Sequence, residues 1–211
     1  TDISFALDNF ARESQRQKTA EEIQLKNTIL KTQQETSLDA ILVVDENGKI
    51  ISYNQKFIDL WHLSPQLVSV GVDVAVLQSV IHQVEKSEEF YAGIRFLNEH
   101  NDQKSREEIR LKDGRIIDRY SAPVIGADRR HYGRVWYFRD ITERKKVETR
   151  IVFLNRVYAV LSGINSLIVR VLNRDELFRE ACQVAIVTGG FRMALIAIVD
   201  RNTMKILPVA S

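Results

Sequence analysis

The side chains that most often do chemistry are few and widely spaced in this chain. The histidines are His62, His82, His100 and His131, and the single cysteine is Cys182. Metal sites, phosphate loops and activated nucleophiles need such groups at short, defined spacings or within glycine-rich turns, and the sequence contains no such arrangement. We therefore expect no catalytic residue and no metal site, and we do not expect this chain to be an enzyme.

Asp140, Ile141 and Thr142 indicate a mechanical task instead. An alternating apolar strand at 131–139 leads through these three residues directly into a charged helix. Asp140 followed three residues later by Glu143 is typical of a capping box, and Thr142 is a second cap candidate. A strand that enters a capped helix without a loop can convert strain in the strand into rotation or fraying of the helix. We predict that Asp140, Ile141 and Thr142 relay a signal.

Composition sets the outer limits for function. The chain has 211 residues, enough for one or two domains, with 45% apolar and 27% charged residues, which is typical of globular proteins. A formal net charge of +2 gives no reason to expect nucleic acid as a partner. One cysteine excludes an internal disulfide framework and fits a reducing compartment, so we expect a cytoplasmic location.

The ends of the chain carry two further expectations. The sequence starts at Thr1 without a visible signal peptide and stops in a region with strand character, so we expect a piece of a longer protein. We also expect no membrane segment, because we find no apolar run of the roughly 18 residues that a spanning helix needs.

The elements that must position the candidate residues follow from periodicity and turn residues. Helices are expected over 3–36, 55–63 and 72–100, and strands over 38–45, 50–54, 105–110, 115–125 and 131–139. Asn47-Gly48 and Asp113-Gly114 predict hairpin turns. Two strands, several helices and three more strands predict an α+β fold with an antiparallel sheet and the helices on one side of it.

Residues 38–142 resemble a PAS domain. The resemblance rests on the run 38–45 (LDAILVVD), on Asp113-Gly114-Arg115 before the fourth strand, and on the run 139–144 (RDITER) at its end. It implies a five-stranded antiparallel sheet with helices on one face, flanked by long signalling helices. It also implies a sensor of a small ligand or of redox state, which passes its signal through the Asp-Ile-Thr motif.

A PAS domain holds small ligands between its sheet and its helices, and this implies a cavity here. The candidate lining residues are Tyr53, Phe57, Trp61, His82, Tyr120, Trp136 and Phe138. Ile41, Val43, Val80, Val84 and Ile94 are further candidates. For the apolar and aromatic members the alternative interpretation is simple core packing.

The resemblance also bears on cofactors. His82 lies in the helical region where haem-binding PAS domains place their axial histidine, and imidazole is a suitable iron ligand. Light-driven flavin adduct chemistry is excluded because 38–142 contains no cysteine, whereas non-covalent flavin stays open. Our main expectation is that no cofactor is bound, and the identity of a cofactor or ligand is left open.

A regular stripe marks the helix expected over 143–172. Its members recur at alternating spacings of three and four and are Ile151, Leu154, Tyr158, Leu161, Asn165 and Ile168. Such a period predicts the seam of a parallel coiled coil, in which a lone Asn at an a position sets the register. This interpretation gives a homodimer through the flanking helices. The alternative is a single amphipathic helix that packs on its own domain.

From Arg150 onward the chain resembles the opening of a GAF domain. The resemblance rests on 154–162, 174–178 and 189–194, and residues 2–8 resemble the last helix of an upstream GAF domain. The expected organisation is a helical linker at 1–37, a PAS domain at 38–142, a signalling helix at 143–172 that merges into the first GAF helix, and an incomplete GAF domain at 173–211.

Two functions are therefore carried forward. The first is a sensory and transmission segment of a bacterial multidomain protein, whose output domain turns over cyclic-di-GMP or is a histidine kinase. The second is a ligand-free PAS domain that serves as a dimerisation and spacer module, with sensing in the GAF domains.

Overall fold

The computed structural model describes residues 2–69, 73–200 and 203–210. These residues form two compact units, 1–142 and 143–211. The first unit holds the long N-terminal helix and a five-stranded sheet with its covering helices. The second holds two helices and a β-hairpin. Each unit is described by itself.

The sheet of the first unit is antiparallel throughout, with strand order β2-β1-β5-β4-β3. Its strands are β1 (Ala40–Val44), β2 (Ile50–Tyr53), β3 (Ser105–Arg110), β4 (Ile116–Ile125) and β5 (His131–Asp140). Both predicted hairpin turns are present, and Gly48 and Gly114 adopt the positive φ values of 83° and 88° that glycine tolerates at such turns. The predicted α+β fold with an antiparallel sheet is confirmed.

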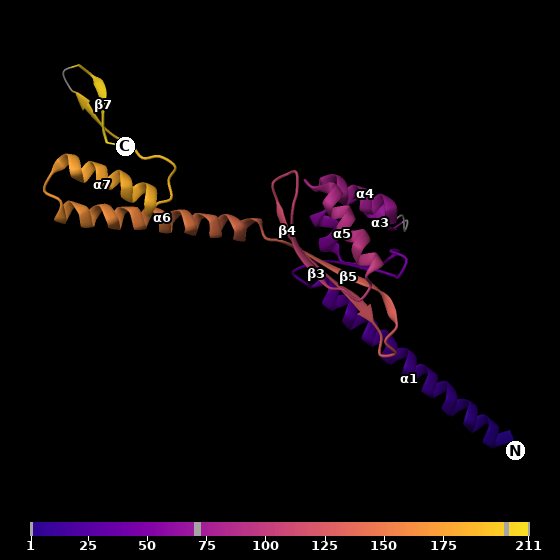
Figure 1. Ribbon diagram of the computed structural model, residues 1–211. Coiled ribbons are helices and arrows are strands. Elements are labelled where there is room, and N and C mark those ends of the chain that lie inside the picture. The colour runs from indigo at the N-terminus through magenta and orange to yellow at the C-terminus, as the bar shows by residue number, and fades with distance from the viewer. Residues whose placement is uncertain (1, 70–72, 201–202, 211) are drawn as a thin grey trace. The chain divides into compact units, whose positions relative to one another are not determined.

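Four helices lie between β2 and β3 in the chain, and α3, α4 and α5 gather on one face of the sheet (Figure 1). They are α2 (Gln55–Leu60), α3 (Pro65–Ser69), α4 (Asp73–Gln83) and α5 (Ser87–Glu99). The single helical stretch predicted over 72–100 is therefore two helices, and Val72 lies outside the described residues. The break occurs because the backbone between the two helices pairs with the end of β3 and the turn that follows it. The N–H of Glu85 donates to the Arg110 carbonyl at 2.9 Å, and the N–H of Lys112 donates to the Gln83 carbonyl at 2.8 Å.

The strand β5 lies in the middle of the sheet, which has an inner face covered by helices and an outer face. It pairs with β1 on one side and β4 on the other, and its side chains alternate between the two faces. Trp136 and Phe138 point to the helix-covered face and are buried, whereas Tyr137 lies on the other face and is half-buried. The apolar core thus lies between one face of the sheet and the helices α2 to α5.

Helix α1 (Asp2–Glu35) is joined to the sheet through the buried side chain of Asn54. Asn54 Oδ1 accepts hydrogen bonds from the N–H groups of Ile41 (2.9 Å) and Phe57 (3.1 Å). Its Nδ2 donates to the carbonyl oxygens of Gln34 (3.0 Å) and Asp39 (2.8 Å). One side chain therefore caps α2, satisfies the start of β1 and holds the end of α1.

The second unit consists of α6 (Thr142–Arg170), α7 (Arg174–Val187) and the hairpin of β6 (Ile196–Asp200) and β7 (Lys205–Ala210). Val160 and Leu167 of α6 are buried, and Gly163 between them faces Val184 of α7. The side-by-side course of α6 and α7 is visible in Figure 1. This stripe of α6 is offset from the predicted seam, so the helix packs on its own unit with a different set of residues.

Among the described residues, α6 is the one helix that is long enough and apolar enough, by length and composition alone, to cross a membrane. The expectation that no stretch reaches this length is wrong, because an 18-residue window of α6 is apolar on average although polar residues such as Asn155, Arg156 and Asn165 interrupt the helix. Soluble proteins contain helices that meet the same criterion, so it assigns no membrane to the chain. What it does establish is that α6 carries much apolar surface, of which little is buried within this chain.

We expect Asn54→Ala to lower the free energy of unfolding of the first unit by about 3 kcal/mol, because buried backbone groups lose their partners. The chain has two tryptophans, Trp61 and Trp136, and both lie in the first unit, so urea unfolding followed by tryptophan fluorescence reports on that unit. Gln55→Ala is the matched control, since among the described residues the exposed Gln55 side chain bonds to Asp59 alone. Equal stability of the two variants would show that the Asn54 bonds contribute nothing.

Candidate functional site

A cavity of about 300 Å³ lies between the inner face of the sheet and helices α4 and α5. This volume is at the lower end of the range for small-molecule pockets. The lining is largely apolar, and Arg119 is its charged member among the described residues. The lining residues are Leu42, Val44, Asn47, Gly48, Ile50, Phe57, Val74, Val76, Leu77, Val80, Phe90, Ile94, Asn98, Arg119, Trp136 and Phe138.

Part of the predicted lining is present in this cavity. Phe57, Trp136 and Phe138 line it, as do Val80 and Ile94. Phe57 and Phe138 pack with their ring centroids 5.8 Å apart, so they form one aromatic wall. These residues also belong to the core, so packing and lining are not exclusive roles here.

Other predicted lining residues lie elsewhere. Tyr120 is on the outer face of the sheet, where its ring centroid lies 6.0 Å from that of Tyr137. Ile41 and Val43 alternate with the lining residues Leu42 and Val44 and therefore also face outward. The prediction was wrong for these three because alternation shows which residues share a face, not which face the helices cover.

Tyr53 and Trp61 support the cavity without lining it. Tyr53 is half-buried against the core. Trp61 is fully buried, and its ring meets the ring of Phe138 edge-on at 5.4 Å. Val84 is buried in the core as well and lies outside the lining. Trp61 thus backs the aromatic wall from the side away from the cavity.

His82 does not fit the predicted haem site. Its side chain is exposed on α4 and lines a shallow surface depression together with His62, outside the apolar cavity. No histidine lines the cavity itself among the described residues, so the residues present do not offer an axial iron ligand there. Within the described part of the chain, no three His, Cys, Asp or Glu side chains lie together as a metal site would require.

Arg119 on β4 is the unusual residue of the cavity. Its side chain is 1% exposed, and its Nη2 pairs with Glu107, the residue directly opposite on β3. Its guanidinium carbon lies 4.6 Å from the ring centroid of Phe90 and 5.0 Å from that of Trp136. Nε and Nη1 are buried and have no hydrogen-bond partner among the described residues.

Burial lowers the pKa of Arg119 to about 10, because the charged form has lost its hydration. The group is still protonated at neutral pH. A lowering of this size corresponds to roughly 3 kcal/mol against keeping the charge in this position. The aromatic faces of Phe90 and Trp136 offset part of that cost through cation–π attraction. Arg119 is therefore a buried cation with unused donors in an apolar cavity.

Arg134 on β5 is a second buried arginine, and its donors are used by the fold. It is 2% exposed, and burial lowers its pKa as well. Its guanidinium donates to Ser121 Oγ and to carbonyl oxygens at and beyond the C-terminal end of α5. The acceptors are Leu97 (3.0 Å), His100 (3.4 Å), Asn101 (3.4 Å), Gln103 (2.9 Å) and Ser121 (2.9 Å). Arg134 thus secures the end of α5 to the sheet.

The three predicted relay residues are brought together at the end of β5. The N–H and the hydroxyl of Thr142 both donate to Asp140 Oδ1, the former at 2.9 Å. The same hydroxyl oxygen accepts the N–H of Ile116 at 2.9 Å, and the N–H of Ile141 donates to the Ile116 carbonyl at 2.9 Å. Ile141 is buried. The start of α6 is therefore bound to the first residue of β4.

The capping box predicted at this position is present only in part. Asp140 accepts the N–H of Thr142, as a residue at a helix start does. Glu143 does not reach back, and its carboxylate instead accepts a hydrogen bond from Lys146 at 2.8 Å. Thr142 instead bonds across to β4, where its hydroxyl oxygen accepts the N–H of Ile116.

Comparison with known families decides what this arrangement is. A family model described as PAS fold matches residues 35–149, more than half of the chain. The chain belongs to the PAS fold family. The five-stranded antiparallel sheet with its helices is the PAS fold, and membership of this family supports a sensory signalling module as its broad function.

Solved PAS structures resemble the chain over this segment. A PAS domain from Colwellia psychrerythraea is 26% identical, with 56% of this chain and 98% of that chain covered and a TM-score of 0.41. The PAS domain of Bordetella pertussis BvgS is 16% identical, with 62% and 96% covered and a TM-score of 0.44. The sensor region of a sensor histidine kinase is 18% identical, with 51% and 41% covered and a TM-score of 0.42. A search of the curated proteins gives no match.

Sequence reasoning did not single out Arg119 or Arg134. In sequence, Asp118, Arg119 and Tyr120 alternate in a strand, and hydropathy alone favours the tyrosine as the inward residue. Serine at 121 and isoleucine at 117, both buried, share the face of Arg119. The burial of these two neighbours is known only from the structure, so the sequence alone carried no signal that Arg119 lies on the covered face.

The two arginines should respond oppositely to replacement by an apolar side chain. We expect Arg134→Met to lower the free energy of unfolding by about 3 kcal/mol, because buried carbonyls lose their donors. Arg119→Met should leave the stability unchanged or raise it, since a buried charge with unused donors is replaced by an apolar group. Urea unfolding followed by tryptophan fluorescence measures both. A loss of stability in Arg119→Met as large as in Arg134→Met would show that Arg119 is structural.

Proposed function

We propose that the PAS domain of this chain is a sensor that relays the state of its cavity to α6 through Asp140, Ile141 and Thr142. The observation that carries the proposal is the Thr142 hydroxyl, which donates to Asp140 and accepts from Ile116. A helix cap alone needs only the contact with Asp140. The second contact makes the start of the helix depend on the position of β4.

The strands that meet at this joint are also the strands that line the cavity. β5 presents Trp136 and Phe138 to the cavity and ends at Asp140, and β4 presents Arg119 and begins at Ile116. A ligand that shifts β4 against β5 changes the geometry in which Thr142 bonds to both. Such a shift works as a signal only if the ligand binds two conformations with different affinity.

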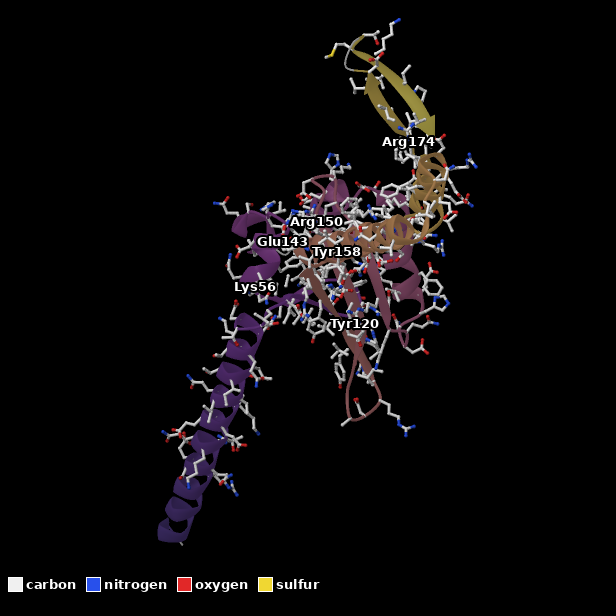
Figure 2. The ribbon with its side chains drawn as sticks, turned by 90° about the vertical axis from the view of Figure 1, so that its left-hand side faces the viewer. Lys56, Tyr120, Glu143, Arg150, Tyr158 and Arg174 are labelled. Atoms are coloured by element: carbon white, nitrogen blue, oxygen red, sulfur yellow. The ribbon has the colours of Figure 1, made fainter. Side chains whose placement is uncertain are left out.

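The proposal includes a second copy of this chain as the partner of α6. Ile151, Tyr158, Leu161 and Ile168 of the predicted seam are at least half exposed in the single chain, whereas Val160 and Leu167 of α6 are buried within it. The exposed stripe keeps the period of 3.5 residues, and Asn165 within it is exposed too. Tyr158 is labelled on α6 in Figure 2. Pairing of two such stripes would cover apolar surface that this chain leaves uncovered.

We further propose the setting of this module. The second unit is the beginning of a GAF domain, and the chain is part of a longer cytoplasmic bacterial protein whose output domain turns over cyclic-di-GMP or is a histidine kinase. The support is the GAF-like sequence from Arg150 onward and the order of α6, α7, β6 and β7. The proposal assigns no catalytic step to this chain.

A second candidate function is a dimerisation and spacer module without a ligand. The exposed apolar surface of α6 favours it, because it needs a partner whether or not the cavity is filled. The unused donors of Arg119 favour sensing instead, since a spacer has no need for a buried cation in an apolar cavity.

The relay is tested by Thr142→Val in the full-length parent, because this change keeps the shape and removes the hydroxyl. We expect the response of the output to its signal to fall by at least about fivefold, because the change removes both hydrogen bonds of the hydroxyl and the loss of about 1 kcal/mol already corresponds to such a factor. Amide hydrogen exchange in the first turn of α6 should rise in parallel. Thr149→Val is the matched control, since in the described part of the chain the Thr149 hydroxyl bonds to the Lys145 carbonyl of the same helix. A normal response in Thr142→Val would contradict the relay.

An insertion series tests the seam independently. One residue inserted after Lys146 rotates the following helix by about 100°, and seven residues restore the phase of a heptad. We expect output to be disturbed by one added residue and recovered with seven, as measured by output activity and by the dimer fraction in analytical ultracentrifugation. Equal behaviour of the two insertions would mean that the seam carries no rotational information.

A further inference from the structure

The cavity lining combines apolar side chains with one buried arginine, and this combination indicates the chemistry of a ligand. Among the described residues, fifteen of the sixteen that line the cavity are uncharged, and the charged one, Arg119, is almost fully buried. Its Nε and Nη1 donors have no partner among the described residues. An apolar cavity needs no cation for packing, and a buried guanidinium whose donors are only partly satisfied is costly in such surroundings.

The same domain shows how it treats a buried arginine that serves the fold. Arg134 lies on the neighbouring strand and gives its donors to Ser121 and to carbonyl oxygens after α5. Both guanidinium groups lie near the ring of Trp136, at 5.0 Å for Arg119 and 5.9 Å for Arg134. Burial beside an aromatic ring is therefore common to both, and the free donors distinguish Arg119.

We propose that the cavity binds a small monocarboxylate with an apolar body, whose carboxylate is held by Arg119. This inference rests on the proposed sensory function and names the class of ligand. Nε and Nη1 lie on different edges of the planar guanidinium, so a carboxylate would accept from one of them and from the second hydrogen of Nη2, which together match its two oxygens. The aromatic wall of Phe57, Trp136 and Phe138 then receives the apolar body of the ligand.

Charge and size narrow the class further. One Nη2 hydrogen of Arg119 already serves Glu107, so the site has little spare positive charge and favours a monoanion over a dianionic phosphate ester. The remaining polar side chains of the lining, Asn47 and Asn98, are neutral. A volume of about 300 Å³ suits a compact acid and not a large cofactor.

The test uses residues 1–211 with hexanoate and cyclohexanecarboxylate as probes and their neutral amides as controls. None of these compounds interferes with tryptophan fluorescence, which reports on the PAS domain through Trp61 and Trp136. We expect at least one of the two carboxylates to raise the Tm in a saturable manner, because binding to the native state alone stabilises it. The corresponding amide should leave the Tm unchanged.

Three variants make the assignment specific. Arg119→Met should weaken carboxylate binding by about 100-fold, as expected for the loss of two charge-assisted hydrogen bonds. Arg119→Lys keeps the charge and loses the two-donor geometry, so it should bind with intermediate affinity. Arg106→Met is the matched control, because Arg106 is an exposed β3 arginine that pairs with Asp118 on the sheet, and it should bind as the wild type does.

Three results would overturn the proposal: no shift with either carboxylate, an equal shift with the amide, or an unchanged shift in Arg119→Met. The stability measurement in Arg119→Met without probe verifies that this variant is folded. Binding is measured on residues 1–211 and does not depend on any output activity. A negative result therefore contradicts the proposed carboxylate ligand but not the proposed relay through Thr142. The relay fails only if Thr142→Val responds normally in the full-length parent, whatever the cavity binds.

Discussion

The pairing of β5 with both β1 and β4 is the constraint on which the rest of this PAS domain depends. Its register places Trp136, Phe138 and Arg134 under the helices and Tyr137 on the opposite face. A slip of one residue would exchange the two sets and remove the aromatic wall of the cavity. The same register determines that β5 ends at Asp140, beside the start of β4. Cavity and exit helix are thus parts of one strand arrangement.

The two buried arginines show how stability and function differ within this arrangement. Arg134 contributes to the fold because its hydrogen bonds join β5 to the Ser121 hydroxyl and to carbonyl oxygens at and beyond the end of α5. Arg119 keeps a charge in the apolar interior with donors to spare. Departures of this kind from good packing concentrate where a protein binds something, because selection there acts on binding and not on stability alone.

The two helices that flank the domain are attached to it by hydrogen bonds that differ in burial. Asn54 holds the end of α1 through a buried side chain with four bonds. Thr142 holds the start of α6 through a half-buried hydroxyl shared between Asp140 and Ile116. A buried network resists opening, whereas a shared bond near solvent can be exchanged at little cost. The entry helix is therefore held firmly, and the exit is the place where a small shift of the sheet can alter a helix.

Sequence by itself determined the elements, their order and the joint. Periodicity and glycine turns predicted five strands, with 105–110 found at the predicted bounds, and cap residues identified Asp140 and Thr142. Only the tertiary structure decided that Arg119 and not Tyr120 faces the cavity, that His82 faces solvent, and that 72–100 is broken near Glu85. The physical reason is that alternation is local, whereas the covered face depends on which side of the sheet the helices occupy. Burial of a charge is likewise a property of the assembled interior, and no neighbour in the chain reveals that two of its donors stay free.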